Sequence, residues 1–320
     1  MKHKNIILAH GSGGKLTHEL VKQVFLPCFN NKALSLLGDS ALLNINGTKL
    51  AFTTDSYVVK PLFFPGGDIG MLAVNGTIND LAVVGAEPMF LSAGFIIEEG
   101  FELSLLEKVA NSMKEAATLA SVEIVTGDTK VVEKGSVDGL YMNTCGIGIV
   151  NNGINLSTSL IEIGDKIIVS GTLGDHGMAV LSERESLGFT PSIKSDCAPL
   201  SGMIKQILAS GAHIKFMRDP TRGGLATTLN EFVNTQKYGI LIDEQTIPVN
   251  DGVRALCEIL GYDSLYIANE GKVVIVVSAH DADKVCEILK DDSLGRDAAI
   301  IGEVVVEPKG KVCLKTVIGG

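Results

Sequence analysis

The segment Met89–Thr126, MFLSAGFIIEEGFELSLLEKVANSMKEAATLASVEIVT, decides the fold class of this chain. It begins with the apolar run Met89–Ile97, which is typical of a β-strand. A helix is predicted over Leu105–Ala120, because its apolar residues recur at spacings of three and four. A second strand is predicted over Val122–Thr126, so strands and a helix alternate within one short stretch.

The same alternation extends in both directions from this segment. Short runs rich in Val, Ile and Thr precede and follow it. A second helix is predicted just before Gly211, because glycine commonly follows the last residue of a helix. These further strands and the helix are Lys49–Thr54, Lys166–Ser170, Val273–Val277 and Leu200–Ser210. Mixed strands and helices predict an α/β or α+β architecture.

Chain length and one polar break predict two domains. The chain has 320 residues, more than a single hydrophobic core usually serves. The polar stretch Asn151–Ser159 follows the glycine-rich end of a strand-like run and is the best boundary. We therefore expect an N-terminal domain over residues 1–155 and a C-terminal domain over residues 156–320.

Composition and charge argue against several classes of function. The formal net charge is −10, whereas nucleic acids and anionic membranes bind surfaces rich in Lys and Arg, so neither partner is expected. The six cysteines include no Cys-x-x-Cys pair, which argues against a zinc or iron–sulfur site. Scattered thiols, without a signal-peptide or membrane-spanning pattern, favour a cytoplasmic protein.

The familiar nucleotide-binding motifs are absent from the sequence. The loop Gly11–Lys15 resembles part of a P-loop but lacks the first Gly and the final Ser or Thr of that motif. It can still contact phosphates, because backbone N–H groups of glycines approach anionic oxygens closely. We therefore predict nucleotide contacts from Gly13, Gly14 and Lys15. A flexible N-terminal segment is an alternative of equal weight.

Five aspartates occupy positions that together indicate a site for metal and polyphosphate. They lie after predicted strands, in turns, or within the largely apolar segment 71–86, and they are Asp39, Asp55, Asp80, Asp128 and Asp219. A single aspartate in such a place is more often a helix cap or a turn residue. Taken together in a glycine-rich chain, they supply the carboxylate oxygens that Mg²⁺ prefers. The pattern predicts ATP bound through magnesium.

The apolar segment 71–86 also carries two asparagines. Asn75 and Asn79 are four residues apart and would share one face of a helix. A polar stripe on an apolar helix is costly unless a partner satisfies it. Bound magnesium with its water shell would do so, and we therefore place Asn79 in the predicted nucleotide site.

Two further residues are candidates for catalysis. Lys130 lies beside Asp128 in the predicted loop after a strand, and Glu270 directly precedes a predicted strand. A glutamate at such a junction can act as a general base if burial raises its pKa. The alternative interpretation, without a catalytic role, is that Glu270 is a solvated loop carboxylate, which is the more common case.

These segments together resemble the HypE family of hydrogenase maturation factors. The matching blocks are Gly66–Gly70, Asn75–Ala82, Gly127–Val132, Arg218–Gly224 and Ala268–Gly271, and the similarity runs from about Leu8 to Gly320. The wider superfamily contains aminoimidazole ribonucleotide synthetase, selenophosphate synthetase and thiamine-monophosphate kinase. The resemblance implies a two-domain α/β fold like that of aminoimidazole ribonucleotide synthetase, with a homodimer formed through the N-terminal sheet.

The resemblance also implies an activity and partners. The family dehydrates a carbamoyl group with ATP. The carbamoyltransferase HypF delivers that group to a C-terminal cysteine. The thiocyanate product is the source of the cyanide ligands of a [NiFe] hydrogenase, and the HypC–HypD complex accepts it.

The resemblance assigns roles to individual residues. It implies magnesium ligands at Asp39, Asp55, Asp80 and Asp219, with Asp128 as a weaker match. It implies catalytic roles for Glu270 as a base and for Lys130 in orienting the substrate or stabilising charge. Thr129, between Asp128 and Lys130, belongs to the same matched block and is assigned to the nucleotide site.

The chain departs from the family pattern at its C-terminus. HypE sequences normally end in Pro-Arg-Ile-Cys, whereas this sequence ends at Gly320 and its last cysteine, Cys313, lies in a strand-like segment. We therefore expect ATP binding without thiocyanate formation on a cysteine of the given sequence. Two alternatives stay open, namely another ATP-dependent synthetase or kinase of the superfamily and a non-catalytic scaffold that docks a maturation partner.

Overall fold

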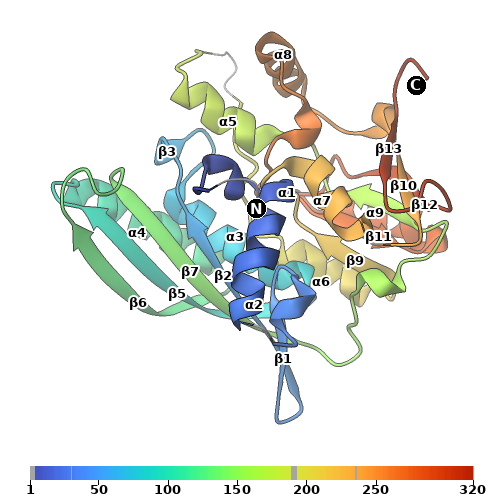
Figure 1. Ribbon diagram of the computed structural model, residues 1–320, viewed down its shortest axis with the longest axis horizontal. Coiled ribbons are helices and arrows are strands. Elements are labelled where there is room, and N and C mark those ends of the chain that lie inside the picture. The colour runs from blue at the N-terminus through green and yellow to red at the C-terminus, as the bar shows by residue number, and fades with distance from the viewer. Residues whose placement is uncertain (1–3, 30, 189–192, 235, 320) are drawn as a thin grey trace.

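The computed structural model describes residues 4–29, 31–188, 193–234 and 236–319. Two sheets, each covered by helices, lie side by side, and the N-terminal helices lie across the junction between them (Figure 1). These are α1 (Gly14–Leu20) and α2 (Leu26–Phe29), joined through a π-helical turn over Val21–Phe25.

The first sheet has the strand order β1-β2-β7-β5-β6. Its strands are β1 (Ala41–Ile45), β2 (Thr48–Tyr57), β5 (Ala86–Glu98), β6 (Glu123–Val132) and β7 (Leu140–Val150). Neighbours are antiparallel except β5 and β6, which are parallel because the helix α4 (Leu103–Leu119) connects them. The strand–helix–strand prediction for 89–126 is confirmed, although β6 continues six residues past the predicted end.

One face of this sheet is covered and the other is open. Leu91 and Ala93 of β5 point into a core shared with α4 and with α3 (Ile69–Val83). On the opposite face, Phe52, Ile147 and Phe90 are paired across three adjacent strands and remain exposed. An open apolar sheet face of this kind marks a surface that another protein surface can cover.

The second sheet has the order β13-β10-β12-β8-β11-β9. Its strands are β8 (Lys166–Val169), β9 (Ile214–Arg218), β10 (Gly239–Asp243), β11 (Val274–Val277), β12 (Ala299–Val305) and β13 (Val312–Lys315). Helices α6 (Ser201–Ala209) and α9 (Ala282–Asp291) pack on one face, and α7 (Gly224–Val233) packs on the other. The predicted strands and the second helix match β8, β11 and α6 within one residue at each end.

Smaller elements complete the fold at the edges of the two sheets. A short hairpin pairs β3 (Phe63–Phe64) with β4 (Gly67–Asp68). Helices α5 (Asp175–Arg184) and α8 (Asp251–Leu260) pack on each other beside the second sheet. Cys313 lies in β13, as the strand-like pattern predicted.

Helix α3 joins the two halves of the molecule. Asp68 begins it by accepting hydrogen bonds from the backbone N–H groups of Gly70 and Met71. The helix is buried almost all round, because Ile78 packs under the first sheet while Ala82 packs against the second. Neither α3 nor any other helix in the described part of the chain has the length and apolar character needed to cross a membrane.

Candidate active site

A cleft of about 790 Å³ opens where α3 meets the second domain. Its walls come from the N-terminal loop, β2, α3, α5 and the segments that follow β9 and precede β11. Six of the residues predicted for the site line it, namely Gly13, Asp39, Asp55, Asp80, Asp219 and Glu270. The cleft therefore gathers side chains that lie far apart in the sequence.

Three carboxylates converge in this cleft. Asp39 lies in the bend before β1, Asp80 in the last turn of α3, and Asp219 directly after β9. One oxygen of each lies within 4.8 Å of the others. Thr53 on β2 places its hydroxyl 2.9 Å from Asp80 Oδ2 and 2.9 Å from the Asp39 carbonyl oxygen. Strand β2 thus holds two members of the group in place.

Burial and mutual repulsion disfavour the ionised forms of these carboxyls. Desolvation, followed by the charge of Asp219, raises the pKa of Asp80 well above its usual range. Desolvation and then the charge of Asp39 raise the pKa of Asp219 to about 7. Desolvation also raises the pKa of Asp39, although the nearby Arg218 opposes it. The group therefore carries more negative charge than its surroundings compensate.

Arg218 supplies only part of the missing positive charge. Its guanidinium lies 3.0 Å from Asp39 Oδ1 and 3.0 Å from Glu231 Oε2, so one cation is shared by two carboxylates. Crowded oxygen donors with raised pKa values are what a hard divalent cation would stabilise. The donor set fits Mg²⁺, and a role for these three aspartates as magnesium ligands stays a prediction.

Asp55 lies at the wall of the cleft, outside the group of three. It was predicted to follow a strand, but it lies inside β2, which continues to Tyr57. Its Oδ1 faces Arg222 Nη2 at 3.6 Å, and its charge contributes to the raised pKa of Asp80. A role for Asp55 as a magnesium ligand stays a prediction.

The N-terminal glycine loop reaches the cleft through Gly13. A Cβ at Gly13 would lie 3.0 Å from the Arg222 carbonyl oxygen, and the positive φ of 76° also favours glycine. Gly14 and Lys15 belong to the first turn of α1 and do not line the cleft. The nucleotide contacts predicted for these two residues stay predictions, and only Gly13 is placed to make one directly.

The structure gives the buried Asn79 hydrogen-bond partners within the protein, and its predicted contact with the nucleotide stays a prediction. Its side chain donates to the carbonyl oxygens of Ala198 and Glu270, each at 3.1 Å, and accepts from the backbone N–H of Leu200 at 2.8 Å. The C-terminal domain therefore satisfies this buried asparagine, and no metal or nucleotide is needed to do so. Asn79 fastens α3 to the segment before α6.

Asn79→Ala is expected to lower the free energy of unfolding by about 3 kcal/mol, because it leaves one buried donor and two acceptors unpaired. Denaturant unfolding measures this change. The exposed Asn230, whose side chain donates to the Ala226 carbonyl oxygen within its own helix, provides the control Asn230→Ala with little expected change. Loss of ATP binding at unchanged stability in Asn79→Ala would support the nucleotide-site interpretation.

Asp128, Thr129 and Lys130 lie away from the cleft of their own chain. They were predicted to follow a strand, but all three belong to the exposed edge strand β6. Gly127 permits this continuation, because a Cβ there would lie 2.4 Å from the Ala93 carbonyl oxygen of the paired strand. The glycine that suggested a loop instead allows close strand pairing.

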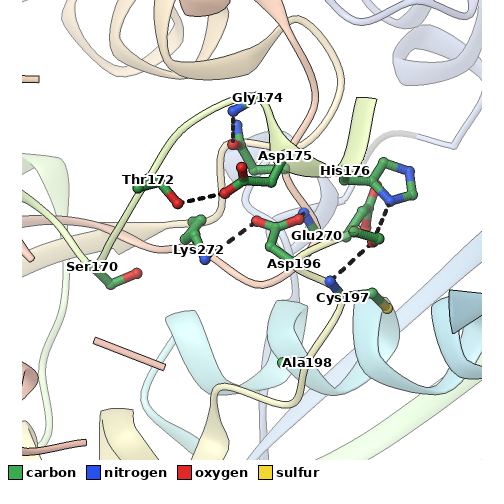
Figure 2. Close-up of polar contacts among 12 residues, drawn as sticks. Ser170, Thr172, Gly174, Asp175, His176, Asp196, Cys197, Ala198, Glu270 and Lys272 are labelled. Carbon is green, nitrogen blue, oxygen red and sulfur yellow. Dashed lines mark hydrogen bonds and ion pairs between the residues drawn. The ribbon is translucent and has the colours of Figure 1, made fainter. Parts of the chain in front are cut away.

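Glu270 lies at the wall of the cleft. Desolvation, followed by the charges of Asp219 and Asp196, raises the pKa of Glu270 well above its usual range, and Arg222 opposes the shift weakly. Figure 2 shows the Glu270 backbone beside Asp196 and Lys272. A carboxylate with a raised pKa that faces a cleft has the properties of a general base.

Several cleft residues were not predicted. Arg218 and Arg222 flank Asp219 in the segment RDPTRGG, and their charges beside an aspartate were the available signal. The glycine-rich sequence around His176 indicated a structural or helix-entry role for this residue. It is the second residue of α5, and its Nδ1 lies 2.9 Å from Ser195 Oγ. Burial lowers its pKa to about 4, so it is neutral near pH 7. His176 nevertheless lines the cleft.

The metal-free chain is expected to lose stability as the pH rises. The pKa of Asp219 is about 7 in the folded chain against an ordinary 3.8. The folded state therefore binds this proton more tightly, and the resulting stability is present below the ordinary value and lost as the pH rises through about 7. Magnesium should reverse this loss. Thermal melts at pH 5 and pH 8 with chelator or magnesium check it, and an equal magnesium effect at both pH values would contradict it.

Comparison with known proteins relates this geometry to a family. Two family models match, AIR synthase related protein N-terminal domain over residues 37–150 and AIR synthase related protein C-terminal domain over residues 162–315. The carbamoyl dehydratase HypE of Rhizobium leguminosarum bv. viciae is 49% identical over 316 residues, which cover 98% of this chain and 90% of that protein.

Solved structures agree with these matches in sequence and in shape. A HypE from a HypE–HypF complex is 50% identical, covers 94% of this chain and 97% of its own, and superposes with a TM-score of 0.89. A hydrogenase maturation protein HypE in complex with ATP is 43% identical, covers 99% and 96% of the two chains, and has a TM-score of 0.83.

Proposed function

We propose a function from the premise that this chain belongs to the HypE family of carbamoyl dehydratases. The cleft uses ATP to dehydrate a carbamoylated cysteine thiol to a thiocyanate, in the maturation of [NiFe] hydrogenases. The convergence of Asp39, Asp80 and Asp219 in a cleft that Glu270 also lines is the observation that carries the proposal.

ATP would lie in the cleft with its phosphates toward the three carboxylates. Asp39, Asp80 and Asp219 would hold magnesium, with Asp55 as a further ligand. Magnesium, when bound, neutralises charge on the transferring phosphoryl group. A HypE relative binds ATP in its solved structure, which supports ATP as the nucleotide. Gly13 and Arg222 lie at the same wall and add a backbone N–H and a positive charge.

The residues suit a two-step dehydration. The carbamoyl oxygen attacks the terminal phosphorus of ATP, ADP leaves, and the nitrogen gives up one of its two protons to solvent, so a poor leaving group becomes the phosphate of an imidoyl phosphate. Glu270 then takes the remaining N–H proton as the carbon–oxygen bond breaks and phosphate departs. The thiocarbamate and ATP thus give a thiocyanate, ADP, phosphate and a released proton. A base whose pKa is raised by burial is well matched to remove this proton near neutral pH.

An S-carbamoylated cysteine peptide with the sequence Pro-Arg-Ile-Cys, supplied in solution, tests the function on the chain as it is. With ATP and magnesium, the peptide should lose the mass of one water molecule while one ADP forms per peptide. Peptide that stays unchanged while ATP is bound would contradict dehydration and favour the scaffold. Turnover of a thiamine phosphate or a phosphosugar instead would favour another enzyme of the superfamily.

The active form is proposed to be a homodimer joined through the first sheet. The open face with Phe52, Phe90 and Ile147 and the edge strand β6 are the surfaces that support this. Lys130 lies on β6 and not in its own cleft, so a catalytic Lys130 would act in the cleft of the second copy.

Mixing two inactive variants tests this arrangement. If Lys130→Ala and Glu270→Gln chains exchange subunits, half of the dimers are mixed and each has one intact site, so about a quarter of wild-type turnover should return. Light scattering establishes the dimer independently. A dimer in which the mixture stays inactive would place Lys130 outside the second site.

HypF and the HypC–HypD complex are the proposed macromolecular partners. HypF would carbamoylate the thiol that this cleft then dehydrates, and a relative of this chain forms a complex with HypF. The HypC–HypD complex would receive the product, as the family resemblance implies.

A further inference from the structure

The backbone of Glu270 is fixed from two sides. Its N–H donates to Asp196 Oδ1 at 3.1 Å, and its carbonyl oxygen accepts from Asn79 Nδ2 at 3.1 Å. The first contact comes from the segment before α6 and the second from α3. Glu270 therefore sits in a loop whose position two other parts of the fold determine.

Asp196 is an unusual side chain for a purely structural position. It is only 3% exposed, and its Oδ2 has no hydrogen-bond partner. The nearest cation is Lys272 Nζ at 3.7 Å, and the Lys272 side chain is 11% exposed. Figure 2 shows the two side chains facing each other. Burying an incompletely paired carboxylate lowers stability relative to a neutral side chain. Stability alone therefore does not account for an aspartate here.

The segment that carries Asp196 is itself held firmly. Ser195 donates its N–H to the Pro65 carbonyl oxygen at 2.8 Å, and its Oγ accepts from the Cys197 N–H at 3.1 Å. A Cβ at Gly271 would lie 1.8 Å from the Asp196 carbonyl oxygen, so the two backbones touch directly. Because its own segment is fixed, Asp196 also fixes the position of Glu270, the residue before Gly271.

We propose that Asp196, paired with Lys272, is a positioning residue that holds the Glu270 backbone so that the Glu270 carboxylate meets the substrate in the cleft. The inference rests on the proposed role of Glu270 as the base. Beyond that role, it assigns control over the rate of proton removal to Asp196, a residue that does not line the cleft. Small displacements of a catalytic group are costly, since a shift of about 1 Å can lower a rate by about 100-fold.

Two readouts on Asp196→Ala test this inference. Exchange of the Glu270 amide hydrogen should accelerate by at least about tenfold, because the Asp196 acceptor is lost. The kcat for the carbamoyl peptide should fall about 10- to 100-fold, while the peptide KM and the affinity for magnesium–ATP change by less than about threefold. If Asp196 only stabilised the fold, its loss would not lower kcat while leaving the peptide KM and the magnesium–ATP affinity unchanged.

Asp165→Ala is the matched control. Asp165 is also buried and its Oδ2 also accepts a backbone N–H, that of Glu162 at 2.8 Å, but it lies outside the cleft lining. Asp165→Ala should keep both the kcat and the Glu270 exchange rate. Asp196→Asn, which retains an acceptor oxygen, should recover most of the kcat lost in Asp196→Ala and also serves if that variant does not fold.

Failure of the role of Asp196 and failure of the proposed dehydration give different results. Unchanged exchange at Glu270 in Asp196→Ala would overturn the inference, and so would a kcat equal to that of Asp165→Ala. A wild-type chain that does not dehydrate the peptide would contradict the proposed function, and with it the catalytic consequence of the contact. Faster exchange at Glu270 in Asp196→Ala would then still establish the contact itself.

Discussion

Asp80→Asn is expected to lower the affinity for ATP in the presence of magnesium by at least about 100-fold, since it removes one of three converging carboxylate charges. The substitution keeps the shape of the side chain and an oxygen that Thr53 can reach. Calorimetric titration with ATP, with and without magnesium, measures the loss. Without magnesium, any residual affinity should be similar in both chains.

The same substitution should have the opposite effect on the metal-free fold. Removing the Asp80 charge relieves repulsion with Asp219 and Asp39, so Asp80→Asn is expected to melt at a higher temperature than wild type above pH 7. Asp165→Asn, a buried carboxylate outside the cleft, is the control and should leave ATP binding unchanged. Full magnesium-dependent ATP affinity in Asp80→Asn would remove Asp80 from the metal site.

Glu270→Gln is expected to reduce peptide dehydration by about 1000-fold, within the range for loss of a general base. Magnesium–ATP affinity should stay within about threefold, because the base acts on the carbamoyl nitrogen and not on the nucleotide. Quenched-flow measurement of peptide and ADP separates the two effects. The exposed Glu162→Gln is the control and should keep wild-type turnover.

The pH dependence of wild-type turnover gives a further check on this base. Only ionised Glu270 accepts a proton, and desolvation places its pKa well above the usual 4.5. Turnover should therefore rise with pH through a midpoint well above 4.5, and that rise should be missing in the residual activity of Glu270→Gln. Glu270→Gln turnover close to that of wild type would assign the base to another residue.

Much of the fold could be predicted from local patterns. The helix within 89–126 is amphipathic, and its spacing reports the face that it buries, so β5-α4-β6 was recognisable. The end of β6 was not, because Gly127 in a strand and Gly127 in a turn look alike without the paired strand. Asp55 was placed after β2 and not inside it, because an aspartate is more common in a turn than in a strand.

The candidate site, like the fold, could be predicted only in part from the sequence. Asp80 stood out because a carboxylate in an apolar helix needs a partner, and the structure places Asp39 and Asp219 beside it. Asn79 gave the same signal but is satisfied by Leu200, Ala198 and Glu270 of the other domain. A single sequence carries no information on which of two unsatisfied polar residues meets protein and which meets ligand.

The fate of the carbamoyl oxygen shows whether ATP phosphorylates it in the cleft. A carbamoyl peptide whose oxygen is a heavy isotope is incubated with the chain, ATP and magnesium, and the phosphate released is analysed by mass spectrometry. Phosphorylation of that oxygen in the cleft predicts that the heavy isotope appears in inorganic phosphate, one atom per thiocyanate formed. Heavy isotope found in water, with unlabelled phosphate, would contradict the account.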